Sequence, residues 1–196
     1  NKHDAHKHLP EIRAALLAGD AKKAQQLSTE HLRGLGSDDR DIADINFGRY
    51  QTFGELTIET GHDGEVKNYR RSLDLSTGLH TVEYDYAGAT HTRTTFCSYP
   101  DRVLVVRFEA DKPGQQNLLL KLATPHKVQA SGKGHVLSAV GVVENNGLKI
   151  DARIAVLNEG GTATATDEGI EVSGADSATF ILVAGTDYAQ SWPTFR

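Results

Sequence analysis

Cysteine is almost absent from this chain of 196 residues, because Cys97 is the only one. A single cysteine excludes an intramolecular disulfide framework and any zinc site that needs several thiolates. Cys97 lies in an alternating segment, 92–99, that is typical of a strand. A nucleophilic thiol needs a neighbouring base and an activating environment, whereas a buried thiol packs as a small apolar group. We therefore expect Cys97 to be a buried structural residue.

Long apolar runs and a large excess of one charge are also missing. The apolar runs 103–106 and 118–120 are far shorter than the roughly 20 residues that a membrane-spanning helix needs. The 21 basic and 26 acidic residues give a formal net charge of -5. They form no basic stripe of the kind that contacts nucleic acid. The sequence thus predicts neither a membrane nor a nucleic acid as partner.

Methionine does not occur at any position, and the chain starts at Asn1. A complete gene product begins with methionine, and no signal peptide is recognisable at this terminus. We therefore expect the sequence to be a fragment or a processed product of a longer protein.

The first 36 residues have a helical pattern. Pro10 suits the first turn of a helix that Gly19 ends. Asp20 can cap a second helix, whose apolar residues recur with helical period up to about Gly34. The sequence predicts a hairpin of two short helices over 1–36, in the same domain as the residues that follow.

The expected sandwich domain covers 37–187. It begins with an acidic loop at 37–44, after which the apolar residues recur with a period of two, which is typical of strands. The expected strands are 51–59, 67–75, 79–86, 90–99, 103–109, 117–123, 135–143, 148–157, 169–172 and 178–184. Short turns join them, and this favours antiparallel pairing. One apolar face per strand must be buried against a second sheet. The predicted fold is mostly β: a large antiparallel β-sandwich with a short N-terminal helical hairpin, followed at 188–196 by the start of a linker.

Two clusters of potential metal ligands occur near the start of the chain. The first combines imidazoles with a carboxylate that could converge on zinc, copper or nickel, and the second is a group of aspartates. The residues are His3, Asp4, His6 and His8, and Asp38, Asp39, Asp41 and Asp44. A frayed terminus accounts for the first, and the second lacks the spacing of an EF-hand calcium loop. We expect no metal and no other cofactor.

Aromatic side chains gather in two places that could contact a sugar, since sugar rings stack on exposed aromatic faces. Tyr84 and Tyr86 share one face of an expected strand, where packing in the sandwich core is the alternative. Tyr188, Trp192 and Phe195 crowd the end of the chain, where packing against a neighbouring domain is the alternative. Tyr188 and Trp192 are the candidate carbohydrate contacts.

Several short motifs follow one another along nearly the whole chain. The most distinctive is Tyr-Arg-Arg-Ser-Leu-Asp-Leu-Ser-Thr at 69–77. The others are Leu-Pro-Glu-Ile-Arg at 9–13, Tyr-Gln-Thr-Phe-Gly-Glu-Leu at 50–56, Thr-Arg-Thr-Thr-Phe at 92–96, Ala-Asp-Lys-Pro-Gly at 110–114, Val-Ser-Gly-Ala-Asp at 172–176 and Thr-Asp-Tyr at 186–188. In this order they resemble the N-terminal domain of glycoside hydrolase family 95, the α-L-fucosidases and relatives that act on α-L-galactosides.

The resemblance implies a front β-sandwich that lacks the catalytic centre. In that family a further segment precedes the helical hairpin. A helical (α/α)6 barrel follows the tail, and it holds a general-acid glutamate and a water activated by asparagine and aspartate, for an inverting mechanism. No catalytic residue is therefore assigned to this chain. Its 26 acidic residues also show no local pattern that selects a catalytic pair.

The same resemblance implies the partners and the compartment. We expect the catalytic barrel of the same polypeptide and a fucosylated oligosaccharide as partners, in the periplasm or outside a bacterial cell. A sandwich without its barrel and its first strands should expose a sheet edge, so self-association is also expected. Three functions stay open: a non-catalytic scaffold domain, which we favour, an autonomous carbohydrate-binding module, and an independent β-sandwich enzyme.

Overall fold

The computed structural model describes residues 4–32, 51–144, 147–189 and 191, and the chain divides into two compact units, Asn1–Gln51 and Thr52–Arg196. The first unit contains a short 3-10 helix (Ala5–His8), α1 (Leu9–Leu17) and α2 (Ala21–His31). The Asp20 carboxylate accepts a hydrogen bond from the Lys23 backbone N–H at 3.0 Å and so caps α2. The predicted hairpin is confirmed, whereas its membership in one domain with the sandwich stays a prediction.

The second unit is built from strands joined by short turns. They are β1 (Glu55–Glu59), β2 (Lys67–Asp74), β3 (Leu79–Tyr86), β4 (Ala89–Ser98), β5 (Val103–Ala110), β6 (Gln116–Ala123), β7 (Lys127–Lys133), β8 (Val136–Val142), β9 (Lys149–Glu159), β10 (Thr162–Thr166), β11 (Gly169–Ala175) and β12 (Ser177–Thr186). Across the described residues, no helix is long and apolar enough to cross a membrane.

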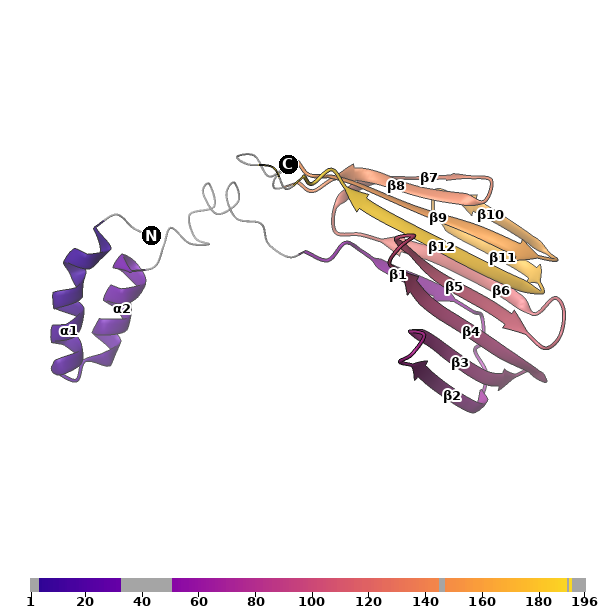
Figure 1. Cartoon of the computed structure of the whole chain (residues 1–196), viewed down its shortest axis with the longest axis horizontal. Coiled ribbons are helices and arrows are strands. Elements are labelled where there is room, and N and C mark those ends of the chain that lie inside the picture. The colour runs from indigo at the N-terminus through magenta and orange to yellow at the C-terminus, as the bar shows by residue number, and fades with distance from the viewer. Residues whose placement is uncertain (1–3, 33–50, 145–146, 190, 192–196) are drawn as a thin grey trace. The chain divides into compact units, whose positions relative to one another are not determined.

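The strands form two antiparallel sheets of unequal width. The small sheet has the order β1-β6-β11-β10, and the large sheet has the order β2-β3-β4-β5-β12-β9-β8-β7. The last strand, β12, therefore lies in the middle of the large sheet, between β5 and β9, as Figure 1 shows. The small sheet packs on the β5 to β7 part of the large sheet. The predicted β-sandwich is confirmed.

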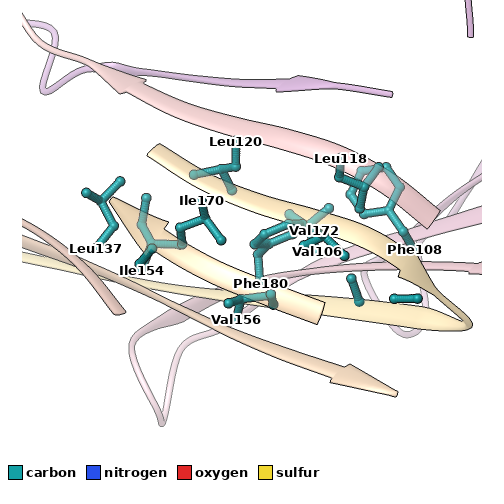
Figure 2. Close-up of a cluster of buried hydrophobic side chains, with 14 residues drawn as sticks. Val106, Phe108, Leu118, Leu120, Leu137, Ile154, Val156, Ile170, Val172 and Phe180 are labelled. Atoms are coloured by element: carbon teal, nitrogen blue, oxygen red, sulfur yellow. The ribbon is translucent and has the colours of Figure 1, made fainter. Parts of the chain in front are cut away.

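The core fills the space between the two sheets. The small sheet contributes Leu120 and Ile170, and the large sheet contributes Ile154, Val156 and Phe180, all at most 1% exposed (Figure 2). Each such side chain stabilises the folded state by roughly 1.5–3 kcal/mol relative to an exposed one. On β9 buried and accessible residues alternate without a break, which is the period of two that the sequence displays.

Two strands, β7 and β10, lie outside the segments that the sequence predicted. Both carry small residues where a strand normally shows large apolar ones. The buried side chains of β10 are Ala163 and Ala165. A Cβ on Gly132 of β7 would overlap the backbone of Thr166 on β10. The two sheets approach closely here, so only small residues fit. Because these residues are small, the apolar pattern of the sequence does not reveal the two strands.

Candidate functional site

The large sheet extends beyond the small sheet at its β2 end. Tyr84 of β3 pairs with His91 of β4, and His91 pairs with Ala110 of β5. Val82, Arg93 and Phe108 form the next row of the same face. Because Phe108 belongs to the core, this row places Tyr84 and His91 on the inner face of the sheet, beyond the strands that the small sheet covers.

The connection from β1 to β2 packs on this inner face through His62 and Gly64. The His62 ring stacks on the Tyr86 ring with 4.2 Å between centroids and an interplanar angle of 19°. A Cβ on Gly64 would lie 3.2 Å from Cε2 of Tyr86, so a larger residue would require the ring or the connection to shift slightly. We call His62, Tyr84, Tyr86 and His91 the Tyr–His cluster.

Short contacts tie the Tyr–His cluster together. His62 Nδ1 lies 2.8 Å from the hydroxyl oxygen of Tyr84, within hydrogen-bond distance. The ring of His91 is 4.5 Å from that of His62 and 5.5 Å from that of Tyr84, centroid to centroid. His91 is 4% exposed, and its Nε2 has no hydrogen-bond partner among the described residues. The cluster therefore fastens the β1–β2 connection to the sheet.

Burial favours the neutral form of both histidines of the cluster. Desolvation lowers the pKa of His62, the nearby His91 lowers it further, and Asp63 opposes the shift. Desolvation also lowers the pKa of His91, against the opposing effects of the Tyr86 backbone and Asp111. Burial likewise raises the pKa of the Tyr84 hydroxyl. All three shifts favour the uncharged form of a group in a partly apolar environment.

The aromatic faces of the cluster are turned toward one another. Tyr86 is stacked with His62, and Tyr84 is stacked with His91 at an interplanar angle of 15°. A sugar ring would need an open aromatic face, and these stacking contacts use the faces for packing. The sequence left open core packing or sugar contact for the two tyrosines, and the geometry favours packing.

Of the two candidate carbohydrate contacts, Tyr188 is the one that the structure describes. Tyr188 is 56% exposed, and its backbone N–H donates to Thr186 Oγ1 at 3.3 Å. Trp192 and Phe195 lie outside the described residues. The prediction that Cys97 is buried was wrong, since this free cysteine is exposed. It follows Arg93 on the inner face of β4, where the sheet extends past its cover.

His62 and His91 were missed because nothing in their spacing suggests a shared site. They are 29 positions apart in the sequence, and a loop and a strand bring them together. The structure describes only part of the two clusters of potential metal ligands near the N-terminus. His8 stacks on His31 with 3.7 Å between ring centroids, while His3 and the group from Asp38 to Asp44 lie outside the described residues. Within the described ranges, no set of three or more potential ligands could hold a metal ion.

One family model matches nearly the whole chain, and known proteins match parts of it. The family model described as "Glycosyl hydrolase family 65, N-terminal domain" matches residues 1–191. A "Probable alpha-fucosidase A" of Aspergillus niger is 27% identical over 158 residues, covering 74% of this chain and 19% of the relative. The protein of the same name in Aspergillus oryzae is 34% identical over 79 residues, covering 40% of this chain and 11% of the relative.

A plant protein is also similar over a shorter stretch. The "Alpha-L-fucosidase 2" of Arabidopsis thaliana is 37% identical over 68 residues, covering 33% of this chain and 8% of the relative. In each of the three cases the match spans at most 19% of the relative's length. The similarity therefore concerns one part of proteins that are several times longer.

Proposed function

The chain belongs to the family of glycosyl hydrolase family 65 N-terminal domains, and we propose that it is the non-catalytic N-terminal β-sandwich of an α-L-fucosidase. One observation carries the proposal: the family match spans 1–191, while the curated relatives that the chain resembles carry fucosidase names and are several times longer. The named activity then belongs to the longer protein, and this domain supports it.

Lowered pKa values at three carboxyl groups fit a supporting role for those groups. Glycoside hydrolysis by a carboxyl pair needs one acid with a raised pKa, so that it still carries its proton at the working pH. The pKa of Asp74 is lowered by hydrogen bonds from Ser76, and that of Asp85 by hydrogen bonds from Asn68 and Thr90. These shifts stabilise the carboxylate and are opposite to what a general acid requires.

A third carboxyl group shows the same direction of shift. Hydrogen bonding by Ser177 and the charge of Arg107 lower the pKa of Glu159. Glu159 accepts from the Ser177 hydroxyl at 2.7 Å and lies 3.5 Å from the guanidinium of Arg107. It thus acts as an ion-pair partner on the surface of the sheet.

The finer assignment, to the family 95 type, rests on the order of the motifs along the chain. It adds a helical (α/α)6 barrel after the tail, which carries the general acid and the activated water. In this proposal the sandwich supports the barrel and helps to shape its substrate cleft.

Fucose release from 2′-fucosyllactose tests the proposal directly. We expect the parent protein that contains this chain to release fucose, and we expect residues 1–196 alone to release none above the uncatalysed background. Comparable turnover by the isolated chain would contradict the non-catalytic assignment. A parent protein that folds but hydrolyses only other glycosides would contradict the fucosidase assignment.

Carbohydrate binding through Tyr188 is a second candidate function, because this tyrosine is 56% exposed and leaves its ring accessible. In this reading Tyr188 and Trp192 contact a fucosylated oligosaccharide. Titration with fucosylated oligosaccharides should then saturate, and Tyr188→Ala should weaken binding, since one stacked ring contributes about 0.5–1.5 kcal/mol. Tyr99, which is 92% exposed and lies outside the candidate contact, supplies the control Tyr99→Ala. The absence of saturation up to millimolar sugar would rule this function out.

A further inference from the structure

The β1–β2 connection is attached to the large sheet mainly through one side chain. Of its residues 61–66, His62 is half-buried and the rest are exposed. The imidazole ring of this histidine contacts the rings of Tyr84, Tyr86 and His91, at centroid distances of 5.7, 4.2 and 4.5 Å. Because the connection buries little else, its position on the sheet depends on this one imidazole.

The connection also covers His91 of β4. The small sheet packs on the part of the large sheet from β5 to β7, and yet His91 is 4% exposed. Among the described residues, the rings that contact it belong to Tyr84 and Tyr86 of its own sheet and to His62 of the connection. We call this arrangement the closed position. When the connection leaves the sheet, which we call the open position, water reaches His91.

Little negative charge is available to a protonated imidazole in the closed position. The carboxylates that attract the two histidines are Asp63 on the connection and Asp111 after β5. Both aspartates are exposed, so solvent screens their attraction. The other charged or titratable groups that interact with the cluster are Tyr84 and Tyr86 on β3 and the cationic Arg93 on β4. A proton added to either imidazole therefore lacks a buried countercharge.

Protonation is easier in the open position than in the closed one. Desolvation is the largest cause that lowers the pKa of each histidine in the closed position, and His91 lowers that of His62 further. In the open position both rings are hydrated and titrate near the ordinary value of about 6.5. Below that pH the open position binds more protons, so closure weakens as the pH falls toward the closed-state pKa values. Opening also hydrates His91 Nε2, which has no hydrogen-bond partner among the described residues.

We propose that the β1–β2 connection is an acid-sensitive strap: protonation of His62 or His91 detaches it from the inner face of β3 and β4 while the two sheets stay folded. The side chains buried between the sheets, such as Leu120 and Ile154, lie outside the Tyr–His cluster. A segment with few buried contacts opens at a lower free energy than the whole domain. Opening exposes the ring faces of the cluster, so the surface that the domain offers changes with pH. The proposal is independent of the fucosidase assignment.

Nuclear magnetic resonance on the full chain, titrated from about pH 7.5 to about pH 5, tests the strap. Gly64 reports on the strap, because a Cβ there would lie 3.2 Å from Cε2 of Tyr86 and its protons therefore experience the ring current of Tyr86. The methyl groups of Ile154 and Ile170, both 0% exposed, report on the core. We expect Gly64 to lose its ring-current shift while the core methyl signals stay in place. A simultaneous change of both reporters would overturn the proposal, as would an unchanged Gly64 signal while His62 and His91 titrate.

The steepness of the pH effect distinguishes two titrating histidines from one. Between about pH 6.5 and the closed-state pKa values, the ratio of open to closed strap should rise by up to about tenfold per pH unit for each histidine, hence up to about a hundredfold for both. His62→Phe keeps a ring against Tyr86 and leaves His91 to titrate, so we expect the rise to be at most about tenfold per pH unit.

The matched control is His80→Gln. His80 lies on the same face of β3 as Val82 and Tyr84, outside the Tyr–His cluster. This variant should keep the pH dependence of the unsubstituted chain. The proposal fails if His62→Phe opens as steeply with pH as the unsubstituted chain does, or if His80→Gln reduces the steepness as much as His62→Phe.

Discussion

At the scale of the residue, His91 is a buried imidazole whose Nε2 lacks a hydrogen-bond partner among the described residues. Charging it would place a cation beside His62, with ring centroids 4.5 Å apart. Asp111 and Asp63 are the acidic groups that oppose these pKa shifts. The Tyr–His cluster is therefore a packing element whose stability depends on both imidazoles remaining uncharged.

Stability should fall when the protein is acidified. The folded state lowers the pKa of His62 and His91, so below the ordinary histidine value of about 6.5 the unfolded state binds more protons. The free energy of unfolding then falls as the pH drops through that value toward the folded pKa. Urea denaturation at about pH 7.5 and about pH 5.5 measures the difference. We expect His62→Phe to reduce this difference in the free energy of unfolding. The control His135→Gln, which replaces an exposed histidine, should leave the difference unchanged. Equal pH dependence in both variants would contradict the mechanism.

The hydroxyl of Tyr84 should contribute measurably to stability. Tyr84→Phe removes the group that lies 2.8 Å from His62 Nδ1 and leaves the ring contacts in place. We expect a loss of about 0.5–1.5 kcal/mol, the net value of one hydrogen bond, in urea denaturation. Tyr69→Phe is the control, because Tyr69 is 56% exposed on β2. A loss of the same size in both variants would show that the His62 contact adds nothing.

At this scale the sequence predicted some features of the site and missed others. Tyr84 and Tyr86 share a face because alternation along a strand is local, and a local pattern is readable from sequence. The contact between His62 and His91 depends on how a loop crosses a sheet, which no local pattern encodes. The exposure of Cys97 was missed for a related reason: alternation predicts the inner face but does not predict where the covering sheet ends.

At the scale of the element, the close approach of β7 and β10 should make Gly132 difficult to replace. A Cβ on Gly132 would overlap the backbone of Thr166, which cannot move as a flexible side chain can. We expect Gly132→Ala to lower the free energy of unfolding by about 1–3 kcal/mol, the usual cost of overpacking.

The matched control is Gly185→Ala, also within a strand, where nothing lies within 4 Å of the added Cβ. It should change stability little or raise it slightly, because alanine restricts the unfolded chain more than glycine does. Thermal unfolding followed by circular dichroism compares the two variants. Equal melting temperatures would show that β7 and β10 pack less closely than the structure indicates.

Strands with large apolar residues were predicted from the sequence, and strands with small residues were missed. β9 alternates large apolar residues with others, β12 contains the continuous apolar run 180–183, and both strands were predicted. β7 and β10 carry alanine, glycine, serine and threonine where the sheets are close. The lack of space between the sheets requires these small residues, and without large apolar residues the sequence shows no strand pattern. The turns were easier to predict from the sequence, because glycines such as Gly78 and Gly88 mark them and adopt positive φ angles of 70° and 80° there.

At the scale of the whole molecule, the sandwich is asymmetric. The small sheet covers one end of the large sheet, and the β1–β2 connection packs on the inner face at the other end. All eight residues of β2 are exposed, although β2 carries the start of the most distinctive sequence motif. Exposed apolar residues on the outer face of the large sheet, among them Leu157 and Val183, add a second uncovered surface. Both features are what a domain made to pack within a larger protein would show.

The isolated chain should therefore associate with itself at high concentration. β2 is an edge strand of the large sheet, and an unprotected edge offers its free backbone groups to a second copy. Leu73→Lys places a charge on this edge and should lower the weight-average mass in sedimentation velocity. Leu75→Lys is the control, since Leu75 is 88% exposed but lies in the turn after β2. If the isolated chain without substitutions stays monomeric over a wide concentration range, the prediction is contradicted. Loss of association only in Leu157→Lys would place the contact on the outer face of the large sheet rather than at the β2 edge.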